Sequence, residues 1–190
     1  DEKVEPVTLV VSVEENKPLL VNQYLKEVTN FSFNEDLFIH QWSLKNRGGR
    51  DHWGQVASEK ASIHVEKVWL EGVTGSKEIV VAVIDSGVDI DHPDLRENIF
   101  INEKEIPNNR IDDDKNGYID DVHGWNFVNN NSNVEDPLGH GTHCAGVIGA
   151  SGKDEKGIKG VSWDVSILPI SYLDKNSRGN LANAILSIDY

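Results

Sequence analysis

The stretch that decides the fold is Leu138-Gly-His-Gly-Thr-His-Cys-Ala-Gly146, in which His140 stands between two glycines. The small residues in and after it predict a tightly packed helix over 140–150. Earlier in the chain, the apolar run Ile79-Val-Val-Ala-Val-Ile84 ends abruptly in Asp85-Ser-Gly87. Such a run is typical of a buried central parallel strand, which delivers the following side chain to the carboxyl edge of its sheet. The sequence therefore predicts an acid at a strand end and a histidine at a helix start.

An Asp followed by a His along the chain suits a charge-relay site in which a serine comes last. We expect Asp85 to hold the imidazole of His140 in the tautomer that accepts a proton and to stabilise the imidazolium. His140 would act as the general base and then as the general acid. Taken singly, Asp85 could instead be a turn or helix cap, and His140 a surface loop residue.

The two motifs resemble the Asp and His signatures of the subtilisin-like serine protease family. The resemblance includes His92-Pro-Asp-Leu95 and Gly160-Val-Ser162 and covers roughly residues 42–190. It implies hydrolysis of polypeptide substrates by a Ser-His-Asp mechanism. The family's third signature, Gly-Thr-Ser followed by a small residue and Pro, is absent from the chain. We therefore expect residues 36–190 to be the N-terminal portion of a peptidase domain that is inactive alone, with the nucleophile and the oxyanion-hole Asn beyond Tyr190.

The order of the predicted elements indicates an α/β fold. A strand (79–84), a long loop (92–137), a helix (140–150), a strand (165–173) and a helix (180–190) follow one another. This alternation implies a three-layer arrangement, a mostly parallel sheet with helices on both faces. The resemblance makes the fold subtilisin-like and incomplete at its C-terminal end.

For two of the predicted helices, the sequence indicates which side chains face a core. The segment 64–72 is predicted to be a short helix that turns Val65, Val68 and Trp69 inward. In the helix over 180–190, four apolar residues are expected to face a core: Leu181, Ile185, Leu186 and Ile188. Residues 1–35, with a candidate strand at 7–13 and a candidate helix within 18–28, are interpreted as an N-terminal extension or the tail of a propeptide.

The second strong motif is Asp112-Asp-Asp-Lys-Asn-Gly-Tyr-Ile-Asp-Asp121. Oxygen-bearing side chains at its first, third and fifth positions, followed by Gly, match the first half of an EF-hand loop. We expect Ca²⁺ here, because the site offers many flexible oxygens. The expected ligands are Asp112, Asp114, Asn116, the carbonyl of Tyr118, and Asp120 or Asp121. The closing Glu of an EF-hand is missing, since His123 takes its place, and the alternative is a solvated acidic loop.

The family resemblance implies a second calcium site. In many members the Asp of His-Pro-Asp-Leu, here Asp94, pairs with oxygens of the loop after the His helix. That loop spans 151–158 and contains Asp154, and Gln41 is a possible further ligand. The alternative for Asp94 is a helix cap or a turn residue.

We expect structural roles for two residues next to His140, namely His143 and Cys144. The spacing of His140 and His143 suits a metal pair, but a pair without a third ligand is weak. The resemblance implies that His143 is a buried, hydrogen-bonded histidine. Cys144 is the single cysteine, so it cannot form an internal disulfide, and we expect a buried free thiol that is not a nucleophile.

Substrate contact is implied by the resemblance for the stretch Asp174 to Gly179. In the family this stretch supplies an edge strand that pairs with the extended backbone of the substrate. The residues expected to bind are Ser177, Arg178 and Gly179. Gly179 would allow close approach, and Arg178 could favour an acidic substrate side chain or point to solvent.

Composition and charge limit the kinds of partner that the protein can bind. The net charge of −14 argues against nucleic acid, and no apolar run reaches the length of a membrane span. The sequence has no secretory signal and no Met, so we expect a processed or excised piece of a secreted, extracellular protein. Further partners would be its propeptide or the remaining C-terminal part of the domain. Two other hypotheses remain: a non-catalytic pseudoprotease that regulates or binds a partner, and an acidic calcium-binding module.

Overall fold

The computed structural model describes residues 35–38, 40–46, 48–50, 54–58, 60–152 and 157–190. All of them belong to one compact unit, Ser32–Tyr190. The strand expected at 7–13, the helix expected within 18–28 and Asp154 therefore lie outside the described residues. None of the helices within these ranges is long and apolar enough to cross a membrane.

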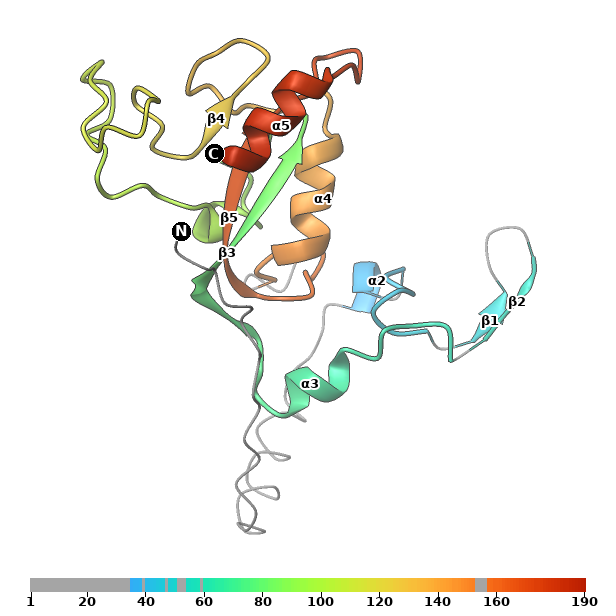
Figure 1. Cartoon of the computed structure of the whole chain (residues 1–190). Coiled ribbons are helices and arrows are strands. Elements are labelled where there is room, and N and C mark those ends of the chain that lie inside the picture. The colour runs from blue at the N-terminus through green and yellow to red at the C-terminus, as the bar shows by residue number, and fades with distance from the viewer. Residues whose placement is uncertain (1–34, 39, 47, 51–53, 59, 153–156) are drawn as a thin grey trace, which may run out of the picture. The chain divides into compact units, whose positions relative to one another are not determined.

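The described elements follow the predicted alternation of strands and helices (Figure 1). In chain order they are α2 (Glu35–Phe38), β1 (Gly49–Arg50), β2 (Val56–Ala57), α3 (Glu66–Leu70), β3 (Gly75–Asp85), the 3-10 helix η1 (Arg96–Asn98), β4 (Trp125–Asn126), α4 (His140–Gly149), β5 (Asp164–Ser171) and α5 (Leu181–Asp189). The loop expected over 92–137 thus contains η1 and β4. Both are too short to show a periodic pattern in the sequence.

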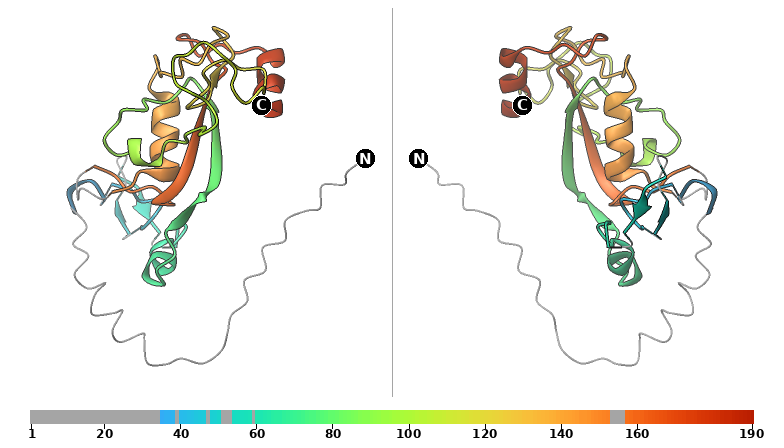
Figure 2. Two further views of the ribbon diagram at one scale, coloured as in Figure 1. Left: turned by 90° about the vertical axis from the view of Figure 1, so that its left-hand side faces the viewer. Right: turned by 90° about the vertical axis from the view of Figure 1, so that its right-hand side faces the viewer.

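A parallel sheet in the order β3-β5-β4 forms the centre of the fold, and β1 and β2 pair as a separate antiparallel ribbon. In the register of the parallel sheet, Ser171 at the end of β5 lies beside both Asp85 and Asn126. Helices α4 and α5 lie on opposite sides of this sheet (Figure 2). The predicted α/β class, a parallel sheet with helices on both faces, is confirmed.

The expectation that 79–84 is a buried, central strand was wrong in part. Strand β3 is longer than predicted and lies at an edge of the described sheet, with β5 in the centre. Ile79 and Val80 are exposed, and within the predicted run only Val83 is buried. Side chains of a strand point to the faces of its sheet, so Ile79 and Val80 are exposed because no described element covers this part of β3.

The packing expected for α5 was wrong. Its four apolar residues are exposed, from 46% for Leu186 to 77% for Leu181, and the buried residue of this helix is Ser187. A polar contact and an aromatic contact hold α5 in place of an apolar stripe. Asn183 donates to the carbonyl of Phe127. The ring of Tyr190, at the end of the helix, packs on the rings of Tyr118 and Phe127.

The main core lies between the sheet and α4. Val83 and Ile167 pack with Leu95 and with Ala145 of α4, and Ile167 is fully buried. The small residues of the helix allow this packing, because a Cβ on Gly149 would come within 2.6 Å of the Val165 side chain. The buried Asn98 ties this core together, since its side-chain amide donates to the carbonyls of Gly149 and Trp163.

A second core cluster surrounds α3. Val65 and Trp69 are buried there with Phe38 and Leu44, as expected for the first two, and the Trp69 indole N–H donates to the carbonyl of Val161. Val68, which we expected to face inward, is 44% exposed. One turn and a half of helix presents a single inward face, which Val65 and Trp69 occupy.

Replacing Ile167 by Ala tests the central position of β5. Because Ile167 is fully buried, the loss of its side chain should lower the free energy of unfolding by about 3 kcal/mol. Ile79→Ala, at a 58% exposed position of β3, is the matched control and should cost under about 1 kcal/mol. Urea unfolding followed by tryptophan fluorescence measures both; equal losses would contradict this core.

Candidate active site

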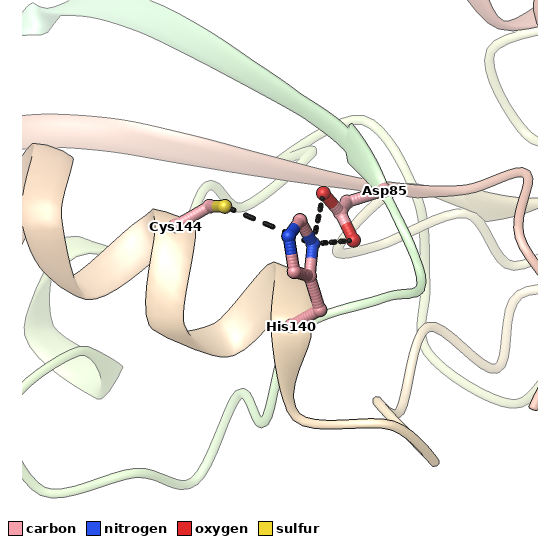
Figure 3. Close-up of side chains that lie close together, drawn as sticks. All are labelled: Asp85, His140 and Cys144. Atoms are coloured by element: carbon pink, nitrogen blue, oxygen red, sulfur yellow. Dashed lines mark hydrogen bonds and ion pairs between the residues drawn. The ribbon is translucent and has the colours of Figure 1, made fainter. Parts of the chain in front are cut away.

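Asp85 and His140 meet at the carboxyl edge of the parallel sheet. Asp85 is the last residue of β3, and His140 is the first residue of α4. Nδ1 of His140 lies 2.8 Å from both carboxylate oxygens of Asp85 (Figure 3). The structure thus brings together two residues that are 55 positions apart in the sequence, in the pairing that the motifs predicted.

This contact fixes the tautomer of the imidazole. A carboxylate only accepts hydrogen bonds, so Nδ1 of His140 carries the proton and Nε2 is left as the acceptor. The Asp85 side chain is 13% exposed, whereas that of His140 is 63% exposed. The acid is therefore shielded while the basic nitrogen is open to an incoming group.

Asp85 also sets the electrostatics of the imidazole. Its hydrogen bond, and then its negative charge, raise the pKa of His140 above that of an ordinary histidine, and Asp136 adds a smaller contribution of the same sign. The protonated form of His140 is stabilised, as a general base requires.

Glycines permit the close approach of β3 and α4. Gly139 precedes the helix with φ at +84°, a left-handed conformation that favours glycine. A Cβ on Gly141 would lie 2.1 Å from the carbonyl oxygen of Gly87. The Gly-His-Gly sequence around His140 is thus required by the contact between the helix start and the turn after Asp85.

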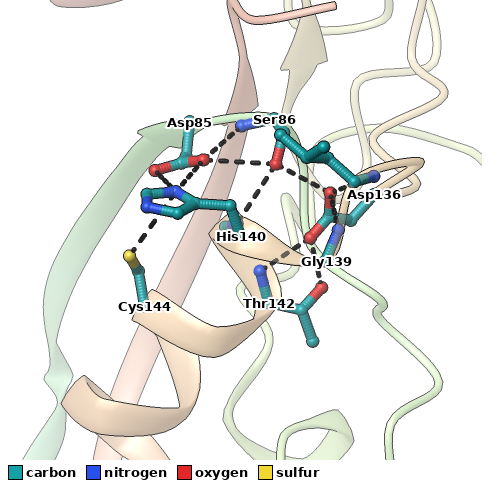
Figure 4. Close-up of polar contacts among 9 residues, drawn as sticks. Asp85, Ser86, Asp136, Gly139, His140, Thr142 and Cys144 are labelled. Carbon is teal, nitrogen blue, oxygen red and sulfur yellow. Dashed lines mark hydrogen bonds and ion pairs between the residues drawn. The ribbon is translucent and has the colours of Figure 1, made fainter. Parts of the chain in front are cut away.

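A polar network that the sequence analysis missed surrounds this pair (Figure 4). Ser86 donates its backbone N–H to Asp85 at 2.7 Å, and its hydroxyl lies 2.7 Å from Oδ1 of Asp136. Asp136 also accepts from Thr142 at the start of α4. The signal that could have pointed to Asp136 is a carboxylate four residues before a Gly-flanked helix start that has no Ser, Thr, Asp or Asn as its cap.

Cys144 lies one helical turn after His140. Its sulfur is 3.9 Å from Nδ1 of His140, and it is a half-buried free thiol (Figure 3). Burial, and then the charges of Asp85 and Asp136, raise the pKa of this thiol, so it stays protonated and is a poor nucleophile. The i, i+4 spacing of a helix brings His140, and not the adjacent His143, next to this thiol.

His143 was wrongly expected to be buried. The structure places it on the exposed side of α4, where it lines a pocket of about 320 Å³ together with His92 and Asp94. The buried face of the helix is taken by Gly141, Ala145 and Gly149, which pack toward the sheet.

An open pocket of about 510 Å³ lies beside the Asp85 end of the pair. Ser86 and Asp136 form one part of its wall, and Leu173, Asp174 and Lys175 form another. The residues we expected to bind substrate, Ser177, Arg178 and Gly179, are not among those that line it.

The stretch from Asp174 to Arg178 is a turn and not the expected edge strand. The Asp174 carboxylate accepts from the backbone N–H groups of Asn176 and Arg178, which closes the turn. Ser177 has φ at +58°, and Gly179 makes its close approach to the ring of Tyr172. Substrate binding by Ser177, Arg178 and Gly179 remains a prediction.

The acidic loop gathers three carboxylates around one point. Oxygens of Glu105, Asp112 and Asp114 lie within 4.8 Å of one another. Asp112 and Asp114 were expected there, whereas Glu105 was missed, because it lies seven residues before the motif and outside any EF-hand spacing. Glu105 is 5% exposed and accepts from the backbone N–H groups of Asp113, Asp114 and Asp120.

The two remaining carboxylates that were expected as ligands, Asp121 and Asp120, point in different directions. Asp121 is fully buried beside the cluster and accepts from Asn102, from the Asn116 amide and from the Tyr190 hydroxyl. Burial, and then Asp121, raise the pKa of Tyr190 far above its usual range. Asp120 turns away and accepts from Asn109 and Arg110.

The ring of Tyr118 is half-buried in an aromatic cluster, and the role of its carbonyl as a ligand remains a prediction. The ring packs edge-on against Trp125 and Tyr190 and so connects the acidic loop to β4 and α5. The acidic loop is thus anchored by an aromatic cluster at its C-terminal end.

At the second expected calcium site, Asp94 lies against Gly157, where an added Cβ would be 2.5 Å from Oδ2 of Asp94. The side-chain amide of Gln41 exchanges two hydrogen bonds with the backbone of Lys159. Asp154 lies outside the described residues, so calcium binding there remains a prediction.

Comparison with known proteins agrees with this geometry. Residues 76–190 match the sequence pattern of the Subtilase family (Peptidase S8). Subtilisin-like protease 1 of Plasmodium vivax is 45% identical over 111 residues, which are 58% of this chain and 18% of that protein. The cell wall-associated protease of Bacillus subtilis strain 168 is 30% identical over 159 residues, 83% of this chain and 15% of that protein. Thermitase of Thermoactinomyces vulgaris is 32% identical over 110 residues, 58% of this chain and 32% of that protein.

A solved structure shares the fold. The serine protease of Aeromonas sobria, determined in complex with a chaperone, superposes with a TM-score of 0.56 at 24% identity, covering 80% of this chain and 22% of that one. An Asp–His pair at the carboxyl edge of a parallel sheet, with the Asp first in sequence, is the order in which the subtilisin type of triad places these two residues. The chain belongs to the subtilase family, and it spans only 15% to 32% of the length of the relatives described above.

The raised pKa of His140 gives a direct test of the pair. Because the folded-state pKa is raised, the stabilisation from the pair is complete below the pKa of an unfolded histidine and is lost as the pH rises through the pKa of His140. Asp85→Asn should move the pKa of His140 down, followed by NMR titration of the imidazole Cε1 proton. Asp89→Asn, which removes the same charge four residues later, is the control; an unchanged titration in Asp85→Asn would refute the pairing.

Proposed function

We propose that the chain is the Asp- and His-bearing part of a secreted, calcium-dependent serine endopeptidase. The observation that carries the proposal is the contact of Asp85 with Nδ1 of His140, which leaves Nε2 free and exposed. Membership of the subtilase family supports peptide-bond hydrolysis as the reaction.

In the proposed mechanism His140 takes the proton of a serine hydroxyl through Nε2. The serine oxygen then attacks the carbonyl carbon of the peptide bond, and the imidazolium donates its proton to the leaving amine. Asp85 holds the ring in orientation and stabilises the imidazolium. Water, deprotonated in turn by His140, releases the acyl-enzyme.

The serine nucleophile is proposed to lie outside residues 1–190. The chain lacks the Gly-Thr-Ser signature, and each relative compared above is several times longer than the matching region. Accordingly, residues 1–190 alone should not hydrolyse peptides. Their own partner would then be the remaining part of the peptidase domain or a propeptide.

Peptide substrates are proposed to lie along the 510 Å³ pocket beside Asp85. The pocket begins at Ser86, directly next to the pair, and reaches Leu173 and Asp174. The turn that carries Ser177, Arg178 and Gly179 follows immediately. An extended peptide in this groove would thus pass both the pocket and the turn.

Calcium is proposed to bind the acidic loop. Glu105, Asp112 and Asp114 would hold it, with Asp121 beside them. The residues fit such a hard cation, because all the side chains offer oxygen. Moreover, the buried Asp121 forms no ion pair with Lys or Arg within the described part of the chain. The ion would neutralise the cluster and stabilise the fold, and it would take no part in the chemistry.

A secreted location is proposed from one of the relatives and from composition. One relative is named for its association with the cell wall of Bacillus subtilis. The net charge of −14 and a calcium site would both suit an extracellular protein, since extracellular calcium modules bind the ion at about 0.1 to 1 mM.

A serine-directed fluorophosphonate tests the proposed function in a whole protein that contains this chain. We expect a single adduct, mapped by mass spectrometry to a serine outside residues 1–190, and its loss in His140→Ala. The isolated chain should take up no label. A folded, calcium-loaded whole protein that stays unlabelled would favour the pseudoprotease hypothesis instead, and labelling that survives His140→Ala would refute the role of His140.

Calcium titration tests the acidic loop. At free Ca²⁺ near 100 times Kd, the chain should gain about 2.7 kcal/mol of stability, measured as a rise in Tm. Asp112→Asn combined with Asp114→Asn should abolish this rise. Asp113→Asn is the matched control, because that carboxylate turns to Ile106 and Asn109. A Tm that does not respond to calcium, or that responds equally in the double variant, would contradict the site.

A further inference from the structure

We propose that Asp136 is a positioning residue for the Asp85–His140 pair. It stands on neither β3 nor α4, yet its carboxylate bonds to residues of both the turn after β3 and the first turn of α4 (Figure 4). It therefore sets the distance between the acid and the base. This inference rests on the proposed function, because the pair is catalytic only if the chain serves in a peptidase.

The two carboxylate oxygens of Asp136 accept hydrogen bonds from different sides of the contact between the end of β3 and the start of α4. Oδ1 accepts from the Ser86 hydroxyl at 2.7 Å and from the backbone N–H groups of Leu138 and Gly139 at 3.0 and 2.9 Å. Oδ2 accepts from the N–H and the hydroxyl of Thr142 at 2.8 and 2.7 Å. Five donors on one carboxylate fix its position, and the donors flank His140 on both sides in the sequence.

Asp136 supplies the cap that α4 otherwise lacks. The N-cap residue is Gly139, which makes no side-chain cap bond, so the first N–H groups of the helix need other acceptors. Thr142 donates its N–H to Asp136, and Gly141 donates its N–H to the Ser86 hydroxyl at 3.1 Å. A carboxylate at a helix N-terminus is also favoured by the helix dipole.

Ser86 joins this cap to the acid. Its hydroxyl lies 3.2 Å from Asp85 and 2.7 Å from Asp136, and its single proton goes to the shorter bond. The same oxygen accepts from Gly141, next to His140. Asp85, Ser86, Asp136 and the first turn of α4 thus form one connected network.

The charge of Asp136 is maintained in this setting. Burial by itself would raise the pKa of Asp136, but the hydrogen bonds from Thr142, Ser86 and Gly139 outweigh it and hold the pKa below its usual range. The Asp136 carboxylate is thus ionised at neutral pH.

Asp136→Asn tests the inference in the 190-residue chain by NMR. An amide offers one acceptor where two oxygens now accept, so one side of this contact between β3 and α4 must open. We expect the Nδ1 proton of His140 to lose its far-downfield resonance and the pKa of His140 to fall. In the whole protein we expect kcat to fall on the order of tenfold to a hundredfold.

Glu135→Gln is the matched control, because it removes the same charge one residue away, and no bond from its carboxylate to α4 occurs among the described residues. A purely structural role of Asp136 would lower Tm while the resonance and the pKa of His140 stay in place, and this result would overturn the proposal. Equal changes in Asp136→Asn and Glu135→Gln would also overturn it, since charge alone would then be the cause.

Ser86→Ala keeps the inference testable if Asp136→Asn does not fold. It removes the bridging hydroxyl and leaves both carboxylates, so a smaller shift of the same resonance is expected, and no shift would count against the proposal. The NMR measurement needs no peptidase activity. Failure of the fluorophosphonate labelling would therefore remove the proposed function without deciding the role of Asp136.

Discussion

The structure depends on one joint, where the end of β3 meets the start of α4. Asp85 and His140 touch only because Gly141 lets the helix come against the backbone of Gly87. Two neighbouring features support this contact. The core between α4 and the sheet sets the distance of the helix from the sheet, and Asp136 accepts from a backbone N–H group in the first turn of the helix. A base that must accept and return a proton gains from such fixed geometry, because misplacement by about 1 Å can cost a hundredfold in rate.

The sequence predicted what is encoded locally. Asp85 and His140 stand in continuous motifs whose glycines and small residues have local causes, so their elements and their pairing followed from the sequence. Asp136 and Glu105 did not, because each accepts from groups that only the folded chain brings to its carboxylate: the Ser86 hydroxyl for Asp136, and the backbone N–H group of Asp120 for Glu105. Burial was predicted least well. Leu181 and Ile188 have the period of an inward helix face, yet burial depends on what covers the face.

The acidic loop and the active site share one support. Tyr118 and Tyr190 clamp the loop onto the aromatic side chains of β4 and the end of α5, and β4 pairs with β5 at Ser171 beside Asp85. Packed rings and one strand thus connect the loop to the carboxyl edge of the sheet.

The parallel pairing of β3 with β5 has a consequence for the order of folding. These strands meet across a long separation, as in the bond between Ser166 and Lys77, 89 residues apart. Contacts so distant in sequence close slowly, because the entropy of the intervening chain must be lost first. The base and its acid are assembled by the same slow step. In a nascent chain the contact of Asp85 with His140 is therefore made only once the sheet exists.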